Sequence, residues 1–454
     1  MRVLIQLRPA ADVVASVLDP GVASTVADVV ADLPADLPGV LIDEAYGPVA
    51  VPRARPSAAH GGPLSLSSRV EFSLSPEHAS VLVRGEIPDS ELPIRLARLQ
   101  SAVREVAGVY ADPRIRAAGP TCGGDGPAGD WQEVRRLLRA SDLWEQGHDG
   151  EGVTVAVCDT GINAAHVRSV LGEEVRIDAE RSWAPPGVRR TPGRYPVEHG
   201  TMCAFDALLP APRATLLDIP ILLSRQGDMS GLLSDAVAAY SHLRHVLNAM
   251  PEESRSLVVS NSWGLFSPEH DLPPGHPGNY SDNPAHPFNL IVGSLADAGA
   301  DIVFAAGNCG RDCPDGRCGF RERPIVGANG HPDVLSVGGV NVRGERVGYS
   351  SQGPGRLAER KPDLCAYTHF AGSGAVGEAD SGTSAACPVA AGVVAAVRTA
   401  RPAARLSPEQ LRTQLNRTAD DRSTVGYDYD YGWGVIDPPA AVAALGRARG
   451  TRAA

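Results

Sequence analysis

The first 116 residues combine short strand-like and helix-like patterns. Apolar positions alternate in RVLIQL at residues 2–7, whereas ADVVASVL and VASTVADVVADL (22–33) have the three-to-four-residue spacing of helices. Strand-like runs return in GVLIDEAYGPVAV, VEFSLSPEHASVLVRGEI and VYADPRI, and SELPIRLARLQSAVREVAG places its leucines and valines on one helical face. This mixed order predicts a small α+β domain over 1–116, with a mobile loop at 52–63.

The pattern changes after a stretch that is rich in glycine and proline. AAGPTCGGDGPAGD at 117–130 has no periodicity and is typical of a linker. Beyond it, the apolar runs VAVCD, TLLDIPIL, SLVVSNSWG, DIVFAAGN and VLSVGGV alternate with helical patterns such as MSGLLSDAVAAYSHLRHVLNAM. Because strands that are apolar throughout are buried on both faces, residues 131–454 are predicted to form an α/β domain with a mostly parallel sheet between helices.

Composition and charge narrow the class of protein. Hydrophobic residues make up 43% of the 454 residues, and the formal net charge is −11, which favours solubility and gives no sign of a nucleic-acid partner. Arg8 and Asp12 interrupt the N-terminal apolar run before it reaches the length of a secretory signal. By this pattern we expect no stretch to approach the roughly 18–20 apolar residues that span a bilayer. We therefore expect a cytoplasmic protein without a membrane partner, with non-standard export as the alternative.

Four polar residues stand out because small residues flank each of them. Asp159 follows the strand VTVAVC, His199 lies in EHGT, Asn308 ends DIVFAAGN, and Ser384 lies in SGTSAACP before the helical run AAGVVAAV. Taken singly, each fits an ordinary role: a turn aspartate, a surface histidine, a turn asparagine and a helix N-cap. Together they supply an acid, a base, an amide donor and a hydroxyl, which are the groups that nucleophilic acyl transfer requires.

Three motifs, VAVCDTGI, HGTMCA and GTSAACPVAAG, resemble those of the subtilisin-like serine proteases (subtilases) in order and spacing. The resemblance covers approximately residues 140–445. It implies a three-layer α/β fold and a serine endopeptidase that acts on peptides or proteins through an acyl-enzyme, without a cofactor or metal. By the same resemblance Asp159 is the triad acid, His199 the general base and Ser384 the nucleophile, and Asn308 donates to the oxyanion.

The resemblance also implies where a substrate binds. Ser262, Trp263 and Gly264 correspond to the strand to which an extended peptide adds. The segment Ala305-Ala306-Gly307 corresponds to the opposite wall of the first specificity pocket. For Trp263 the alternative is a core aromatic residue.

The α+β domain at 1–116 resembles the family's inhibitory, folding-assisting prodomain. It would act as an intramolecular inhibitor, and cleavage would fall in 117–130; a retained targeting or substrate-recognition domain is the alternative. The loop 266–287 raises a second functional hypothesis, a dedicated processing protease for one peptide precursor. A catalytically silent binding protein is disfavoured, because none of the triad residues is missing.

Eight cysteines are present. Cys309, Cys313 and Cys318 follow Asn308 at a spacing that does not match a zinc site. We expect these three to be reduced thiols in an ordered loop, with a local disulfide as the alternative. Three other cysteines lie close in sequence to catalytic candidates, and we expect them to be small buried packing residues: Cys158, Cys203 and Cys387.

Overall fold

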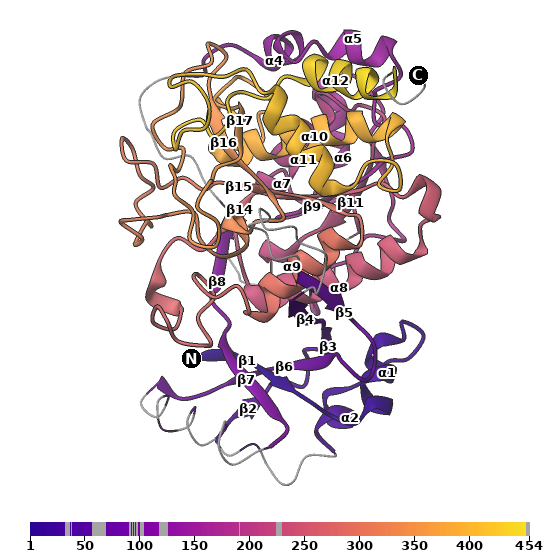
Figure 1. The fold of residues 1–454 in the computed structure, drawn as a ribbon, viewed down its shortest axis with the longest axis vertical. Helices are drawn as coiled ribbons and strands as arrows, with labels where there is room; N and C mark the ends of the chain where they lie inside the picture. The colour runs from indigo at the N-terminus through magenta and orange to yellow at the C-terminus, as the bar shows by residue number, and fades with distance from the viewer. Residues whose placement is uncertain are drawn as a thin grey trace.

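The chain folds into an N-terminal unit and a larger α/β unit, which lie one below the other in Figure 1. The architecture comes from a computed structural model. It describes residues 1–31, 37, 39–56, 70–89, 92, 94, 96, 99, 104–117, 126–189, 191–223 and 229–450.

The N-terminal unit is built on an antiparallel sheet of strand order β2-β6-β1-β7, with β3 also paired to β6. Two helices, α1 and α2, precede β2. A separate two-stranded sheet joins β4 to β5. The bounds are β1 (Arg2–Leu7), α1 (Ala11–Leu18), α2 (Val26–Val30), β2 (Leu41–Ile42), β3 (Val49–Val51), β4 (Arg53–Pro56), β5 (Val70–Ser73), β6 (Ser80–Glu86) and β7 (Val106–Ala111).

Alternation along β1 makes both faces of this sheet apolar. Val3 and Ile5 pack in the N-terminal unit's own core, together with Val14 of α1. Leu4 and Leu82 belong instead to a core that the larger unit shares. Because successive side chains of a strand point to opposite faces, one face of the sheet is covered by its own helices and the other by the larger unit.

Three details of the sequence prediction for the N-terminal unit are either different in the structure or fall outside the described residues. The loop expected at 52–63 begins as a strand, because Arg53–Pro56 pairs with β5. The helix expected at 90–108 lies largely outside the described residues, and its last three residues begin β7. VYADPRI is two strands rather than one, because Pro113 has no N–H to continue the ladder.

The second of these strands, β8 (Arg114–Ala117), leaves the N-terminal sheet altogether. It pairs antiparallel with β14 (Trp263–Gly264) on one side and with β12 (Ser230–Leu232) on the other. Both partners belong to the larger unit. The N-terminal unit therefore ends as the central strand of a sheet whose other strands come from the larger unit.

The larger unit contains a seven-stranded sheet of order β10-β11-β9-β13-β15-β16-β17, in which every pairing is parallel. Its strands are β9 (Thr154–Cys158), β10 (Arg176–Ile177), β11 (Thr215–Ile219), β13 (Leu257–Asn261), β15 (Asp301–Ala305), β16 (Leu335–Val340) and β17 (Leu364–Tyr367). Its helices are α4 (Trp131–Leu137), α5 (Ala140–Glu145), α6 (Ala164–Leu171), α7 (His199–Leu208), α8 (Leu233–Ala249), α9 (Pro287–Asp297), α10 (Thr383–Ala400), α11 (Pro408–Thr418) and α12 (Pro438–Gly450).

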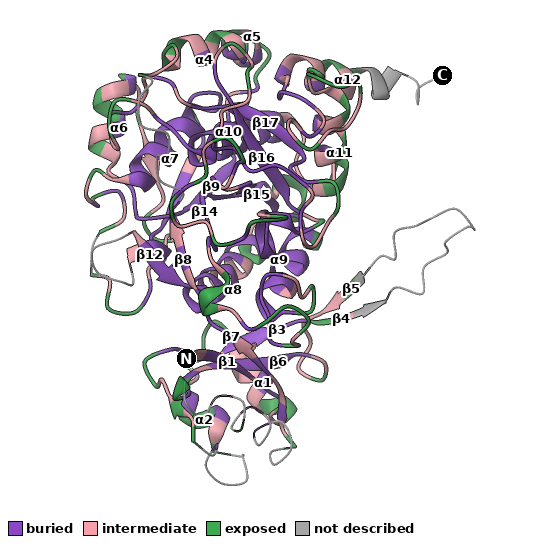
Figure 2. Ribbon diagram, turned by 90° about the vertical axis from the view of Figure 1, so that its left-hand side faces the viewer, coloured by how far each residue is buried: buried purple, intermediate pink, exposed green. Residues whose placement is uncertain are grey.

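Helices cover both faces of this sheet, as its apolar strands require. Val155 and Val157 of β9 face the helices α7 and α10, whereas Ala156 and Cys158 face α8 and α9. Figure 2 shows the result: the strands and α10 are buried at the centre, and exposed residues concentrate on outer elements such as α4, α6 and α12. The three-layer α/β architecture with a mostly parallel sheet is confirmed.

Helix α10 has 18 residues and a mean hydropathy of 1.3, which by length and composition would suffice to cross a membrane. This differs from the expectation that no stretch approaches that limit. Yet 89% of the helix is buried inside the protein, between the sheet and other helices. An all-round apolar helix is typical of the centre of a large domain, and α10 occupies that place here.

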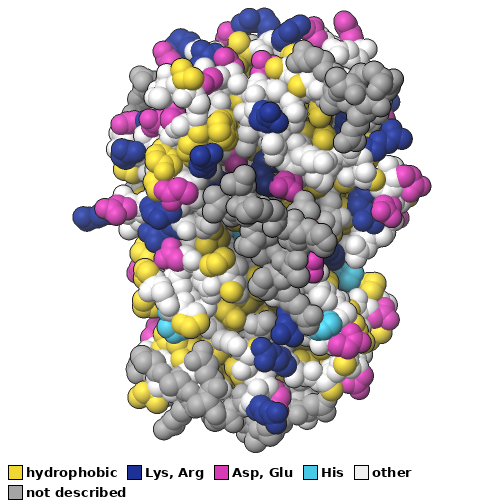
Figure 3. Space-filling view, in the orientation of Figure 1, with side chains coloured by type: hydrophobic (Ala, Val, Ile, Leu, Met, Phe, Trp, Pro, Cys, Tyr) yellow, Lys and Arg dark blue, Asp and Glu magenta, His cyan; other side chains and the backbone are white. Residues whose placement is uncertain are grey.

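On the face shown in Figure 3, cationic and anionic side chains are interspersed over both units. No large block of one sign is seen among the described residues of that face. This distribution agrees with the modest net charge of −11.

Helices α7 and α10 are in close contact at Gly392. A Cβ added there would lie 2.1 Å from the carbonyl oxygen of Ala207. We predict that Gly392→Ala lowers the free energy of unfolding by about 1–3 kcal/mol, because the helices must move apart. Thermal unfolding of the purified variant measures this.

The matched control is Gly446→Ala on α12, where a Cβ meets no atom within 4 Å. That substitution should leave stability unchanged or raise it by up to about 1 kcal/mol, because alanine is the better helix former. Equal midpoints for the two variants would contradict the close-contact interpretation.

Candidate active site

The sequence candidates lie at the carboxyl edge of the parallel sheet. Asp159 directly follows β9, Ser262 follows β13, and Asn308 lies three residues beyond the end of β15. His199 and Ser384 are in the first turns of α7 and α10. Because the carboxyl ends of neighbouring parallel strands meet at one edge, residues that are far apart in sequence come together there.

Asp159 and His199 form a buried hydrogen-bonded pair. The imidazole Nδ1 lies 2.8 Å from Oδ1 and 3.0 Å from Oδ2 of the carboxylate, and both residues are at most 1% exposed. The backbone N–H of Thr160 donates to Oδ1 as well, at 2.8 Å. Because Nδ1 faces the carboxylate, the carboxylate fixes the ring so that Nε2 points the other way, which is the orientation of a general base.

Cys203 joins this pair to the serine. It lies one turn after His199 on α7, and its Sγ is 3.7 Å from His199 Nδ1, 3.5 Å from Asp159 Oδ2 and 3.6 Å from the carbonyl oxygen of Ser384. Burial and the charge of Asp159 raise the pKa of the thiol well above its ordinary value. A protonated thiol beside an imidazole nitrogen that is already hydrogen-bonded is a poor metal site, so we assign no metal ligand here.

Ser384 is held by Ser262 through two reciprocal hydrogen bonds. The hydroxyl of Ser262 donates to the carbonyl oxygen of Ser384 at 3.0 Å. The hydroxyl of Ser384 donates to the carbonyl oxygen of Ser262 at 3.2 Å. Ser384 is fully buried in the intact chain. These bonds fix the first turn of α10 against the end of β13.

Asn308 is oriented by Thr383, the neighbour of Ser384. The Oδ1 of Asn308 accepts from the backbone N–H and from the hydroxyl of Thr383, both at 2.9 Å. The same hydroxyl accepts from the backbone N–H of Gly307 at 3.0 Å. Since Oδ1 is engaged by Thr383, the amide group Nδ2 is directed away from that residue and serves as the donor end.

Asp218 is a residue that sequence reasoning missed. It is the penultimate residue of β11, close enough to Asp159 for its charge to act on it, and its carboxylate accepts from the backbone N–H groups of Gly193 at 2.8 Å and of Ile162 at 3.2 Å. Burial raises its pKa to about 7. The contacts tie together the loops that follow Asp159 and precede His199. A charged residue inside TLLDIPIL was the only sequence signal.

The predicted substrate strand is paired in the intact chain. The backbone of Trp263 and Gly264 is β14, whose partner is β8 of the N-terminal unit. The Trp263 side chain is buried against Phe304 and Phe288, so the tryptophan is a core aromatic residue whose backbone forms the strand.

The segment Ala305-Ala306-Gly307 lies across a pocket from this strand. The residues that line the pocket are uncharged: Trp263, Gly264, Leu265, Phe266, Ala305, Ala306, Gly307, Cys309, Pro324, Val326 and Asn329. Asn329 Nδ2 bridges its two walls, donating to the carbonyl oxygens of Trp263 at 2.8 Å and of Ala305 at 2.9 Å.

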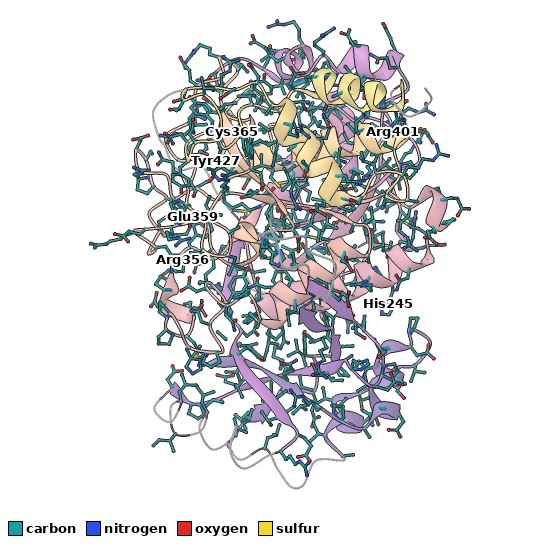
Figure 4. The ribbon with its side chains drawn as sticks, in the orientation of Figure 1. His245, Arg356, Glu359, Cys365, Arg401 and Tyr427 are labelled. Carbon is teal, nitrogen blue, oxygen red and sulfur yellow. A yellow bond between two sulfur atoms is a disulfide. The ribbon has the colours of Figure 1, made fainter. Side chains whose placement is uncertain are left out.

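The expectation of reduced thiols after Asn308 is wrong. Cys309 and Cys318 form a disulfide with a Cα–Cα distance of 5.8 Å, and Cys313 is disulfide-bonded too. The fold brings the two ends of this loop together, since the backbone N–H of Asp315 bonds the carbonyl of Asn308. The other described cysteines are free and buried, which confirms the packing expectation: Cys158, Cys203 and Cys387, with Cys365 in β17 (Figure 4).

Thiol reactivity should separate these two groups of cysteines. We predict that a maleimide leaves Cys158, Cys203, Cys365 and Cys387 unlabelled in the native protein, because burial keeps them protonated and inaccessible. Denaturation alone should expose these four, whereas Cys309 and Cys318 should need a reductant as well. Peptide mass spectrometry gives the labelled positions. Labelling of Cys309 after denaturation without reductant would contradict the disulfide.

Comparison with known proteins agrees with this geometry. The model of the subtilase family matches residues 150–434. The chain is 25% identical to subtilisin DY of Bacillus licheniformis (67% of this chain and 96% of that protein) and to subtilisin E of Bacillus subtilis (67% and 69%). It is also 25% identical to the membrane-bound transcription factor site-1 protease of Homo sapiens (77% and 30%). The chain belongs to the subtilase family and is a serine endopeptidase.

Proposed function

We propose that this endopeptidase cleaves peptide bonds through an acyl-enzyme on Ser384 and is held inactive by its own N-terminal unit. The observation that carries the catalytic part is the cluster around Cys203, whose sulfur contacts Asp159, His199 and Ser384 together. The inhibitory part rests on the pairing of β8 with β14.

In the proposed reaction, His199 accepts the hydroxyl proton of Ser384 as the oxygen attacks the peptide carbonyl carbon. Asp159 stabilises the imidazolium that forms. The oxyanion is stabilised by Nδ2 of Asn308 and by the backbone N–H of Ser384 at the start of α10. The imidazolium then protonates the leaving amine, and a water molecule activated by His199 hydrolyses the acyl-enzyme.

The position of β8 supports the proposed inhibition, because β8 pairs with the strand to which an extended substrate would add. Arg116 is opposite Gly264 and Ala117 is opposite Trp263 in an antiparallel register. The guanidinium of Arg317 donates to the carbonyl oxygen of Ala117 at 3.0 Å. A peptide that added to β14 would need the same backbone groups, so β8 must leave first.

The N-terminal unit is anchored at the start of α8. The carboxylate of Asp112 accepts from the backbone N–H and the hydroxyl of Ser234 at 2.7 and 2.9 Å. Arg84 donates to the hydroxyl of Ser234 and forms an ion pair with Asp235 at 3.3 Å. Further along α8, His245, labelled in Figure 4, lines a groove together with residues of α1 and of the segment between β3 and β4.

The loop 266–287 also contacts this unit. The backbone N–H of Ala111 at the end of β7 donates to the carbonyl oxygen of Gly278 at 2.9 Å. Leu272 belongs to the hydrophobic core of the N-terminal unit. These contacts support a role of the loop in holding the inhibitory unit, and they weaken the reason for proposing a dedicated processing protease.

Self-cleavage is proposed to fall within 117–130. Ala117 is fixed opposite Trp263, next to the Ser262 that binds Ser384. On the other side, the N–H of Ala128 donates to the carbonyl of His369, whose own N–H bonds Asp380 in the segment before Ser384. Both anchored ends therefore flank the nucleophile. Because disulfides persist in oxidising compartments, the Cys309–Cys318 bridge supports export over the cytoplasmic location.

The test is to purify the wild-type chain and Ser384→Ala side by side. We predict cleavage within 117–130 and labelling by a fluorophosphonate probe for the wild type only, because both need the activated hydroxyl. Gel mass shift, N-terminal sequencing and probe fluorescence measure this. An intact wild-type chain that the probe labels would refute self-processing, and a folded wild-type chain that the probe never labels would refute catalysis by Ser384.

Two substitutions test the proposed oxyanion donor. Asn308→Ala should lower kcat by about 10²–10³-fold with little change in KM, because the donor acts only on the transition state. Thr383→Val keeps the amide but removes the hydroxyl bond that orients it, and we expect roughly a tenfold loss in kcat. Steady-state kinetics on a peptide substrate give both values. Unchanged kcat in Asn308→Ala would remove the residue from the mechanism.

A further inference from the structure

Two buried carboxyl groups meet below the candidate active site. Asp206 lies on α7, two turns after His199, and Asp380 lies four residues before Ser384. They are 0% and 1% exposed, they come from segments that pack in one core, and each carboxyl group shifts the pKa of the other. The contact therefore joins the helix that carries the imidazole to the segment that carries the nucleophile.

The segment before Ser384 is wrapped around the carboxyl of Asp380. The backbone N–H of Ser373 donates to Oδ2 at 2.6 Å, and its hydroxyl donates to Oδ1 at 2.7 Å. A Cβ on Gly372 would lie 2.1 Å from Oδ2. The backbone of Asp380 is bonded in both directions to Phe370. Asp380 is thus the fixed member of the pair, and these donors favour its charged form.

Asp206 has a different environment. Among the described residues, no N–H or O–H group donates to either of its carboxyl oxygens. Two ionised carboxylates only accept hydrogen bonds, so contact between Asp206 and Asp380 requires a proton on one of them. Burial raises the pKa of both groups, and for Asp206 the charge of Asp380 adds to this.

We propose that Asp206 and Asp380 share one proton and act as a positioning pair that fixes the α7 helix of His199 against the segment of Ser384. This inference rests on the proposed function, because it concerns the geometry of the same site. When the shared proton leaves, two negative charges face each other in an apolar environment. The segment 372–380 is then pushed away from α7, and Ser384 loses its alignment.

The sign of the pH dependence follows from the raised pKa values. A carboxyl whose pKa is higher in the folded state contributes stability below its ordinary pKa and loses that contribution as the pH rises through the raised value. The pair therefore limits the alkaline side. The titratable groups around it are His199, Cys203 and Asp159, with His166 of α6, whose Nε2 is 2.8 Å from the carbonyl oxygen of Ser373.

Asp206→Asn tests the role of the proton, because an amide donates to the Asp380 carboxylate without titrating. The pH profile of kcat/KM of the processed enzyme should show an alkaline limb that moves up by about one pH unit or more in this variant. Asp206→Leu provides no donor and should lose roughly tenfold in kcat, which Asp206→Asn restores. The control is Asp271→Asn, another buried carboxyl of raised pKa, whose four hydrogen-bond donors all lie between residues 272 and 281; it should leave the limb in place.

A second measurement does not need activity. Two uncleaved chains are compared by infrared spectroscopy at about pH 8: Ser384→Ala and the double variant Ser384→Ala/Asp206→Asn. Their difference spectrum should contain the C=O band of a protonated carboxylic acid. Absence of this band would overturn the shared proton, even if the enzyme were not a serine peptidase. The band could also be present while the pH profiles of wild type and Asp206→Asn have the same alkaline limb. That combination would overturn the positioning role.

Discussion

The close packing of α7 against α10 is the contact on which the remaining structure of the site depends. Gly392 leaves no room for a side chain beside the carbonyl oxygen of Ala207, so the two helices meet backbone to backbone. On the same pair of helices, Cys203 of α7 contacts both His199 and the carbonyl oxygen of Ser384. Because both helices are buried on nearly every side, neither can shift without disturbing the sheet beneath them.

Burying the groups of the candidate active site requires that each negative charge at the carboxyl edge be compensated locally. Asp159 is compensated by His199 and the N–H of Thr160, and Asp218 by the N–H groups of two loops. Asp380 receives two hydrogen bonds from Ser373. For Asp206 the proton takes the place of such donors. The same low-dielectric surroundings that strengthen catalytic hydrogen bonds thus raise the cost of each unpaired carboxylate.

The contacts of the N-terminal unit with the larger unit also provide hydrogen-bond partners for polar groups. Strand β14 is an exposed edge whenever nothing pairs with it, and such edges attract any extended peptide. In the intact chain β8 satisfies these backbone groups, while Asp112 satisfies N–H and O–H donors at the start of α8. Under the proposed function, inhibition and substrate binding would use one set of backbone donors and acceptors, and the N-terminal unit would control the active site by occupying that set.

The sequence by itself determined the family and the three-layer fold. Apolar periodicity depends on residues that are neighbours in the chain, and motifs such as HGTMCA contain their own small flanking residues. Both signals can therefore be recognised within a short stretch of sequence. Only the tertiary structure decided that Cys309 bonds Cys318, that β8 joins β14, and that Asp206 faces Asp380. Each of these contacts joins residues whose approach is set by how separate strands, helices and loops pack. No local pattern specifies that packing, because it depends on the burial of the whole chain at once.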